Sequence, residues 1–323
     1  MQPWMAPLVP SAPAQARTEP AQRNPAHTTQ EATRAGTEVL FSGAPLSPPP
    51  STNVGPAWHP DGMSPQRVTW VPPGAWLAPG YAEWQAPARL ATAVACLWAG
   101  VVPDGADRET LVLPDGCSDL IWEQGVGAAV AGPDTGPARS TTKAGAVVVG
   151  VRFRPSAGGQ VLGLPLSEIR DRRVPLAGLL PAAARRLPAT LDPAEAAARV
   201  LDIAGILVAD RAPDGAMTRA AALLRDPAAR TEEVADELGL SVRQLRRRCH
   251  AAAGYGPKTL QRVLRFQRFV RMVDTPGGPP GLADAAARAG YADQAHLTRE
   301  CAALSGLTPA ALVRLRNAAA DRA

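Results

Sequence analysis

The sequence has few residues of the kinds that build redox, metal or covalent sites. Only four of its 323 residues are cysteines and four are histidines, and no histidine lies between His59 and His250. A histidine-based metal site in the middle of the chain is therefore excluded. No Cys-x-x-Cys pair occurs, which argues against a disulfide framework or a zinc site and fits a reduced cytosol. The cysteines are Cys96, Cys117, Cys249 and Cys301.

Long apolar runs are also missing. No stretch of 18 apolar residues occurs, so no membrane-spanning helix is expected. The first residues lack a basic region and their apolar stretch is broken by prolines, although Ala14-Gln-Ala16 resembles a cleavage site. A secretory signal is therefore disfavoured, and we expect a cytoplasmic protein.

Lysine is scarce, and positive charge is unevenly distributed. All basic residues except Lys143 and Lys258 are arginines, a bias that genomic base composition can also produce. Residues 217–323 hold 17 Lys+Arg against 10 Asp+Glu, a net of +7, and the rest holds 17 against 19, a net of −2, giving the total of +5. This asymmetry predicts an anionic partner for the C-terminal third, with nucleic acid the first candidate and a membrane surface the second.

Residues 1–66 are rich in Pro, Ala, Ser, Thr and Gln and show no sustained periodicity. Such a segment buries too little apolar surface to offset chain entropy, so we expect a disordered tail. Two alternatives stay open: translation could start at Met63 rather than Met1, or the tail could contact a partner.

Residues 67–190 favour a mostly-β domain, because short β-prone runs alternate with Gly, Pro and Asp turns. A helix from Asp192 to Val208 is expected next, with Asp192 as N-cap and Pro193 at the first helical position. Residues 191–216 therefore read as a helix and linker. The strands are expected at 94–102, 110–113, 119–123, 128–131 and 146–153, and short helices at 157–162 and 176–184.

The C-terminal residues 217–318 contain two helix-turn-helix patterns. In the first, a helix over 232–238 capped by Thr231 is followed by Gly239 and by a helix over 242–253 capped by Ser241. Its second helix places Arg243, Arg246 and Arg247 on one stripe, which suits bidentate bonds to guanine or neutralisation of phosphates. A solvated basic face is the alternative interpretation. The spacing of helix, glycine turn and serine cap favours DNA.

The second pattern runs from Leu282 to Leu304, with its turn at Gly290. Its groove-facing positions are Gln294, Ala295, Thr298 and Arg299, where glutamine can pair with adenine and arginine with guanine or phosphate. Between the two patterns, a long helix over 258–274 carries Arg262, Arg265 and Arg268. We expect phosphate contacts from these three arginines and Ser241, although solubility alone could explain the arginines.

These motifs resemble the AraC/XylS family of bacterial transcription regulators over essentially all of 217–316. The matching residues include Val234-Ala235, Leu238-Gly-Leu-Ser241, Ala286-x-x-Ala-Gly-Tyr291, His296-Leu-x-Arg299 and Gly306-Leu-Thr-Pro309. The resemblance implies that each unit inserts its second helix into successive major grooves on one face of DNA. It points to Arg243, Arg246 and Arg247 in the first unit and to Gln294, Ala295, Thr298 and Arg299 in the second.

The second unit departs from the family's pattern. Ala285, Ala289 and Cys301 stand where the family usually has large apolar residues. Smaller side chains bury less apolar surface, which lowers their contribution to stability by roughly 1–3 kcal/mol per position. We therefore expect the second unit to be the softer one.

Regulators of this family often carry an N-terminal effector or dimerisation domain. Val112 to Trp122 and Val149 to Pro155 resemble an uncharacterised domain found in some of them. Asp115, Asp119, Arg152 and Arg154 could form an effector pocket or a structural charge network. The expected architecture is thus α+β and multidomain: a disordered tail, a mostly-β sensing domain and an all-α double helix-turn-helix domain.

The function predicted is a sequence-specific DNA-binding transcription regulator, associated with the nucleoid. Double-stranded DNA is the expected partner, with RNA polymerase, a small-molecule effector and a second copy of the chain as further candidates, and no metal, cofactor or membrane is expected. An enzyme with its active site in the β domain is the alternative. Against it, residues 66–210 show no histidine, nucleophile elbow or phosphate loop. Nonspecific nucleic-acid binding through arginine is a third interpretation.

Overall fold

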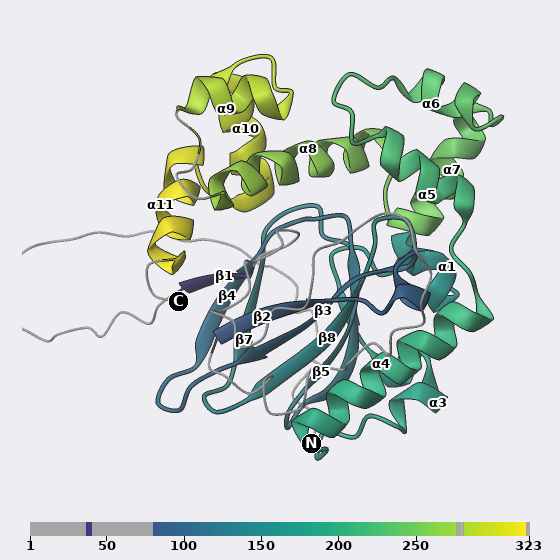
Figure 1. The fold of residues 1–323 in the computed structure, drawn as a ribbon, viewed down its shortest axis with the longest axis vertical. Helices are drawn as coiled ribbons and strands as arrows, with labels where there is room; N and C mark the ends of the chain where they lie inside the picture. The colour runs from purple at the N-terminus through teal and green to yellow at the C-terminus, as the bar shows by residue number, and fades with distance from the viewer. Residues whose placement is uncertain (1–36, 41–79, 276–278, 280, 321–323) are drawn as a thin grey trace, which may run out of the picture. The chain divides into compact units, whose positions relative to one another are not determined.

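The computed structural model describes residues 37–40, 80–275, 279 and 281–320 (Figure 1). Most of the predicted disordered tail, including Met63, lies outside the described residues. Within that tail, Thr37–Leu40 forms strand β1, which pairs in parallel with β4. These four residues depart from the expected disorder.

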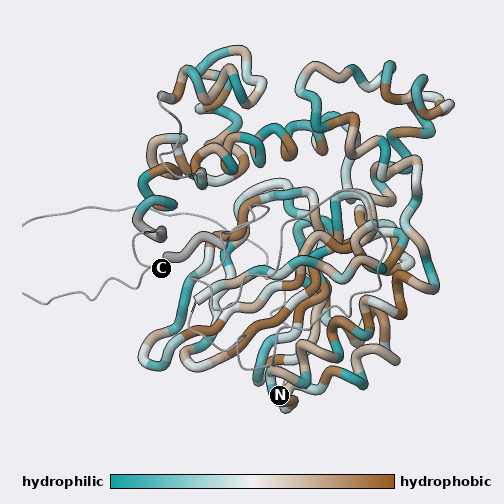
Figure 2. Tube along the Cα trace, viewed as in Figure 1, coloured by the Kyte–Doolittle hydropathy of each residue, from teal (hydrophilic) through white to brown (hydrophobic). Residues whose placement is uncertain are grey.

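The N-terminal domain is built on a six-stranded antiparallel sheet with the strand order β2-β3-β8-β5-β6-β9. Its central strands β8 and β5 are rich in Val, Leu, Ile and Trp, and Figure 2 shows this part of the sheet as predominantly hydrophobic. Residues of this kind favour a sheet that is covered on at least one face. The strands are β2 (Gly80–Gln85), β3 (Val94–Val101), β5 (Ser118–Glu123), β6 (Gly127–Ala131), β8 (Val147–Phe153) and β9 (Arg173–Pro175).

Helix α4 (Pro193–Asp210) covers this sheet and closes its core (Figure 1). Asp192 caps it by accepting hydrogen bonds from the backbone N–H groups of Ala194 and Glu195, as the sequence predicted. The apolar face of α4 packs over Trp122 and Phe153, neither of which has exposed surface. Short helices α1 (Gly158–Leu162), α2 (Leu176–Leu179) and α3 (Pro181–Ala184) complete this layer.

A second, three-stranded sheet has the order β1-β4-β7, with β4 at Arg108–Val112 and β7 at Ala138–Thr142. The turn after β4 leads to Pro114–Gly116. Strand β7 is largely exposed and polar, as suits an edge strand.

The C-terminal domain is entirely helical and contains two helix-turn-helix units joined by the long helix α8 (Figure 1). Every helix of this domain contributes residues to its core, and Phe266 and Phe269 of α8 are fully buried there. The helices are α5 (Gly215–Leu223), α6 (Thr231–Glu237), α7 (Val242–Ala253), α8 (Pro257–Asp274), α9 (Leu282–Ala289), α10 (Gln294–Ser305) and α11 (Pro309–Ala320).

The β domain and the helical domain share a continuous apolar contact. Leu111 and Leu113 belong to the core of the helical domain although they lie in and just after β4. The side-chain amide of Gln267 on α8 donates to the carbonyl of Pro114 at 2.6 Å. Helix α1 also packs against the C-terminal part of α7.

The predicted strands all occur, within two residues of the expected bounds at each end. The helices α6 to α10 are found where the motifs placed them, whereas α5 and α11 were not predicted. Four strands of the described residues were not predicted: β1, β2, β7 and β9. Helix α6 begins at Thr231 with Arg230 as its N-cap, so the cap lies one residue earlier than expected. Among the helices of the described residues, none is long and apolar enough to cross a membrane.

Candidate DNA-binding interface

The first helix-turn-helix unit consists of α6 and α7 joined by a tight turn. Gly239 has a φ of 64°, a left-handed conformation that an L side chain rarely adopts. The backbone N–H of Leu240 then donates back to the carbonyl of Ala235 at 2.9 Å. Ser241 begins α7 with a capping box, because its hydroxyl accepts from Gln244 N–H while the Gln244 side chain accepts from Ser241 N–H.

Helix α7 separates its buried and exposed faces cleanly. Leu245 and Cys249 point into the core and have at most 1% of their surface exposed. Arg243, Arg246 and Arg247 are exposed, and none of them has an ion-pair partner among the described residues. The structure therefore presents the three predicted arginines as one free cationic stripe.

Arg248 behaves differently from its three neighbours. Its guanidinium pairs with Asp214, the N-cap of α5, with Nε 3.1 Å from a carboxylate oxygen. Partial burial acts to raise the pKa of Asp214, but hydrogen bonding to Arg248 together with its charge outweighs burial and lowers the pKa. The arginine that turns back toward the fold is neutralised, and the arginines that face outward are not.

The second unit, α9 and α10, repeats this construction. Gly290 has a φ of 91°, and a Cβ there would lie 2.3 Å from the Pro227 side chain, so both conformation and space require glycine. Asp293 caps α10 by accepting from His296 N–H at 2.6 Å. The imidazole of His296 meets the Tyr291 ring edge-on at 5.2 Å, which gives this histidine a packing contact.

The predicted groove-facing residues of α10 are less uniform than those of α7. Gln294, Ala295 and Arg299 are exposed. Thr298 is half-buried, and its hydroxyl donates to the carbonyl of Gln294 at 2.8 Å. The second unit thus offers fewer free polar groups than the first.

Two of the predicted phosphate contacts are engaged within the protein. Arg262 forms a bidentate pair with Glu300 of α10, at 2.8 and 3.0 Å. Arg265 lies over the ring of Tyr291, with its guanidinium carbon 5.0 Å from the ring centre. Both arginines therefore fasten α8 to the second unit. Sequence spacing could not reveal this role, because the partners lie 26 residues or more farther along the chain.

The other two predicted phosphate contacts differ from each other. The Ser241 hydroxyl is engaged in the cap of α7. Arg268 is exposed and has no ion-pair partner among the described residues. Burial, with help from nearby Arg225 and Arg268, lowers the pKa of Arg271, which continues the same arginine series on α8. A second cationic surface therefore lies near the C-terminal half of α8.

The candidate effector residues separate into a buried cluster and one outlier. Arg152 lies 3.1 Å from Asp119, 3.1 Å from Glu83 and 3.5 Å from Asp115, and all four side chains are 8–16% exposed. The indole of Trp98 donates to Asp119 at 2.7 Å. Arg154 is not part of this cluster, because its Nε donates to the carbonyl of Ala91 at 2.7 Å. Glu83 was missed because its strand, β2, was not predicted.

Burial dominates the electrostatics of this cluster. It raises the pKa of Asp115 to about 6, while the charge of Arg152 acts in the opposite direction. The same burial raises the pKa of Glu83 and of the Cys117 thiol, which argues against a reactive thiolate at that position. No group of residues suited to hold a metal ion occurs among the described residues.

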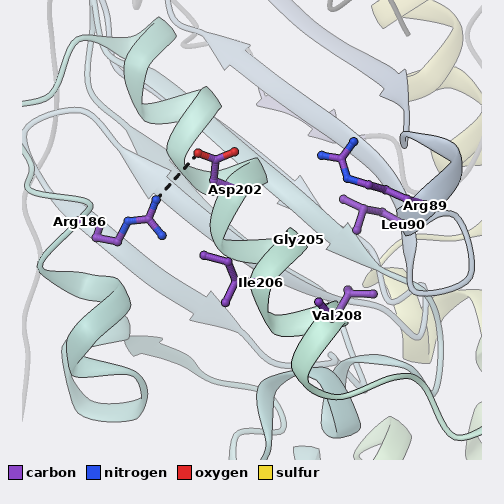
Figure 3. A pocket seen from close by; sticks show the side chains of 8 residues that line it. Arg89, Leu90, Arg186, Asp202, Gly205, Ile206 and Val208 are labelled. Atoms are coloured by element: carbon purple, nitrogen blue, oxygen red, sulfur yellow. Dashed lines mark ion pairs between the residues drawn. The ribbon is translucent and has the colours of Figure 1, made fainter. Parts of the chain in front are cut away.

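A separate hollow of about 500 Å³ lies along α4 (Figure 3). Arg186 approaches Asp202 on one side, at 3.8 Å, and Arg89 of the short helix η2 (Ala88–Leu90) lies on the other side. Ile206 is half exposed there. None of the sequence-predicted site residues lines this hollow.

Paired helix-turn-helix units with an exposed cationic recognition helix define a DNA-binding protein. Comparison with protein families agrees. Residues 234–314 match the family described as "Helix-turn-helix domain", and residues 82–175 match the family described as "Domain of unknown function (DUF6597)". The chain is a DNA-binding transcription regulator. Its C-terminal domain is a helix-turn-helix domain of the AraC type, joined to an N-terminal domain of the second family.

Comparison with curated proteins gave no match. Among solved structures, the chain is similar to ToxT from Vibrio cholerae, at 11% identity and a TM-score of 0.39, over 68% of this chain and 98% of ToxT. A ToxT structure bound to (E)-4-(8-methylnaphthalen-1-yl)but-3-enoic acid has 10% identity and a TM-score of 0.37, over 73% of this chain and 98% of the other. The assignment of the C-terminal domain rests on the family match. Neither family match favours the enzymatic alternative.

Proposed function

We propose that α7 and α10 enter successive major grooves of duplex DNA and that α7 supplies most of the base recognition. The observation that carries this proposal is the stripe of Arg243, Arg246 and Arg247, which is exposed and unpaired among the described residues. Arginine in the major groove can bond guanine in a bidentate manner. The adjacent Arg248 is neutralised by Asp214, so the free charge is confined to the outward face.

In this proposal α10 contributes fewer base contacts. Gln294 and Arg299 have polar ends that reach solvent, whereas Ala295 has none and the Thr298 hydroxyl already donates to the backbone. Arg262 and Arg265 act indirectly, by holding α10 against α8. Arg268 remains the best candidate for a phosphate contact on the connecting helix.

The β domain is proposed to sense a signal, because it contacts α8 directly. Pro114 accepts a hydrogen bond from Gln267, and a Cβ at Gly116 would lie 3.3 Å from the Leu260 side chain. The turn that makes these contacts also carries Asp115 of the buried cluster. A change at the cluster could therefore reach the helix that joins the two DNA-binding units.

The Arg247→Ala substitution tests base recognition by α7. We expect it to weaken binding to the preferred duplex by about 1–3 kcal/mol and to relax base preference in one half of the site. Fluorescence anisotropy with the preferred and a scrambled duplex gives both values. Arg185→Ala is the matched control, because Arg185 is exposed in the β domain and its loss changes net charge equally. Equal weakening on both duplexes would contradict recognition by Arg247.

A further inference from the structure

A second hollow, of about 270 Å³, lies where the β domain meets helix α5. The β domain contributes Thr92 and Arg154 to its wall, and the α5 segment contributes Thr218 and Arg225. The remaining wall is made of alanine and proline side chains. The hollow thus combines two guanidinium groups and two threonines with a small apolar surface, and no carboxylate lines it.

The guanidinium of Arg154 is held in place without being neutralised. Its Nε donates to the carbonyl of Ala91 at 2.7 Å, and its side chain is half-buried. Among the described residues, no carboxylate lies within ion-pair distance of Arg154 or of Arg225. Arg152 and Arg248, by contrast, each have a carboxylate partner. Among the described residues, two positive charges at one hollow are therefore left without a counter-charge.

Further positive charge surrounds the site. Arg225 is close enough to Arg271 of α8 to help lower the pKa of that guanidinium, after burial and together with Arg268. Positive charge therefore lies both on the wall of the hollow and beside it, and no carboxylate lines the hollow. Such a region attracts anions and is stabilised when one binds.

We propose that this hollow binds a small free oxyanion of the phosphate class, held by Arg154 from the β domain and Arg225 from the DNA-binding domain. Guanidinium groups bind phosphate oxygens through short, charge-assisted hydrogen bonds. Thr92 and Thr218 also line the hollow and add polar surface to it. Because the two arginines come from different domains, the bound anion bridges the domains.

The source of the phosphate distinguishes this site from the DNA interface. A DNA phosphate would have to enter a recess that is partly formed by the β domain, whereas a small anion needs only the 270 Å³ available. The site therefore favours a free phosphate-bearing molecule. An effect of that molecule on DNA affinity rests on the proposed function, whereas binding of the molecule to the hollow does not depend on it.

Titration of the full-length protein with inorganic phosphate tests the proposal. Chloride at matched ionic strength is the reference, and calorimetry and the thermal unfolding midpoint report binding. We expect saturable phosphate binding that becomes about tenfold weaker in Arg154→Gln and in Arg225→Gln, because each loses a charge-assisted hydrogen bond. Arg185→Gln, which removes an exposed charge elsewhere, should bind phosphate like the parent.

Two outcomes overturn the proposal: no saturable binding of phosphate by the parent, or equal binding by all four proteins. Arg225 is exposed, so Arg225→Gln keeps the test valid even if Arg154→Gln fails to fold. A second titration uses the preformed complex with duplex DNA. Retained phosphate affinity supports a free anion. Displacement of phosphate by DNA, with weaker DNA binding in Arg225→Gln, would mean that DNA supplies the phosphate and would overturn the assignment to a small molecule.

Discussion

At the scale of single residues, the chain separates arginines that hold the fold together from arginines that are free. Arg152, Arg248 and Arg262 each have a carboxylate at 2.5–3.1 Å, and each joins two elements. Arg243, Arg246 and Arg247 have no such partner among the described residues. Sequence spacing identified the free stripe on α7 correctly as exposed, because a helical repeat fixes which residues share a face. It could not separate Arg262 and Arg265 from phosphate contacts, because Glu300 and Tyr291 are distant in sequence.

The buried cluster around Arg152 predicts a measurable dependence of stability on pH. The pKa of Asp115 is about 6 in the folded protein, above the value of about 3.9 expected in an unfolded chain. The folded state therefore keeps its proton over this interval, and the free energy of unfolding falls as pH rises from about 4 to about 6. The contribution of Asp115 is at most about 3 kcal/mol.

Asp115→Asn should flatten this dependence, since asparagine keeps an oxygen that can accept from Cys117 N–H but does not ionise. Urea unfolding between pH 4 and 7 measures it. Because burial also raises the pKa of Glu83, the variant should keep part of the pH dependence of its unfolding free energy. A variant whose stability follows the parent at every pH would show that Asp115 does not hold a proton in the folded state.

At the scale of elements, α8 connects the two DNA-binding units. Its buried face packs in the common core, while Arg262 and Arg265 contact Glu300 and Tyr291 of the second unit. Ala285, Ala289 and Cys301 are fully buried there, yet they are small and provide little apolar area. We therefore expect the contacts of Arg262 and Arg265 to contribute strongly to holding α10 in place.

The Arg262→Ala substitution tests this positioning role. We expect a coupling free energy of about 1 kcal/mol between Arg262 and Glu300 in a double-mutant cycle, because the pair is bidentate but partly solvated. Hydrogen exchange should become faster in α9 and α10 and stay unchanged in α7. Arg268→Ala, an exposed change on the same helix, provides the control. Zero coupling together with unchanged exchange in α10 would contradict the role.

The sequence predicted helices better than edge strands, for a physical reason. Ser241, Asp192 and the glycine turns mark the helix ends through hydrogen bonds that are local in the chain. Strand β7 is mostly exposed and polar, so Ala138–Thr142 shows none of the alternation that identifies a half-buried strand. Strand β9, at three residues, is too short to produce a pattern. Such strands are defined by their neighbours in the sheet.

At the scale of the whole molecule, the β domain contacts the connecting helix through the turn that carries Asp115. Leu111 and Leu113 complete the core of the helical domain, and Gln267 bonds to Pro114. The arrangement of the two recognition helices is thus supported both from within the helical domain and from the β domain. Binding of an anion at Arg154 and Arg225 would act on the same boundary.

Selection of bound sequences from a random duplex library tests the central claim most directly. Two recognition helices in successive major grooves predict an enriched site with two parts whose centres are about 10–10.5 base pairs apart. The part read by α7 should be the better defined, and Arg247→Ala should relax that part alone. Enrichment of no sequence, or of a single short element that Arg247→Ala leaves unchanged, would contradict recognition by the paired units.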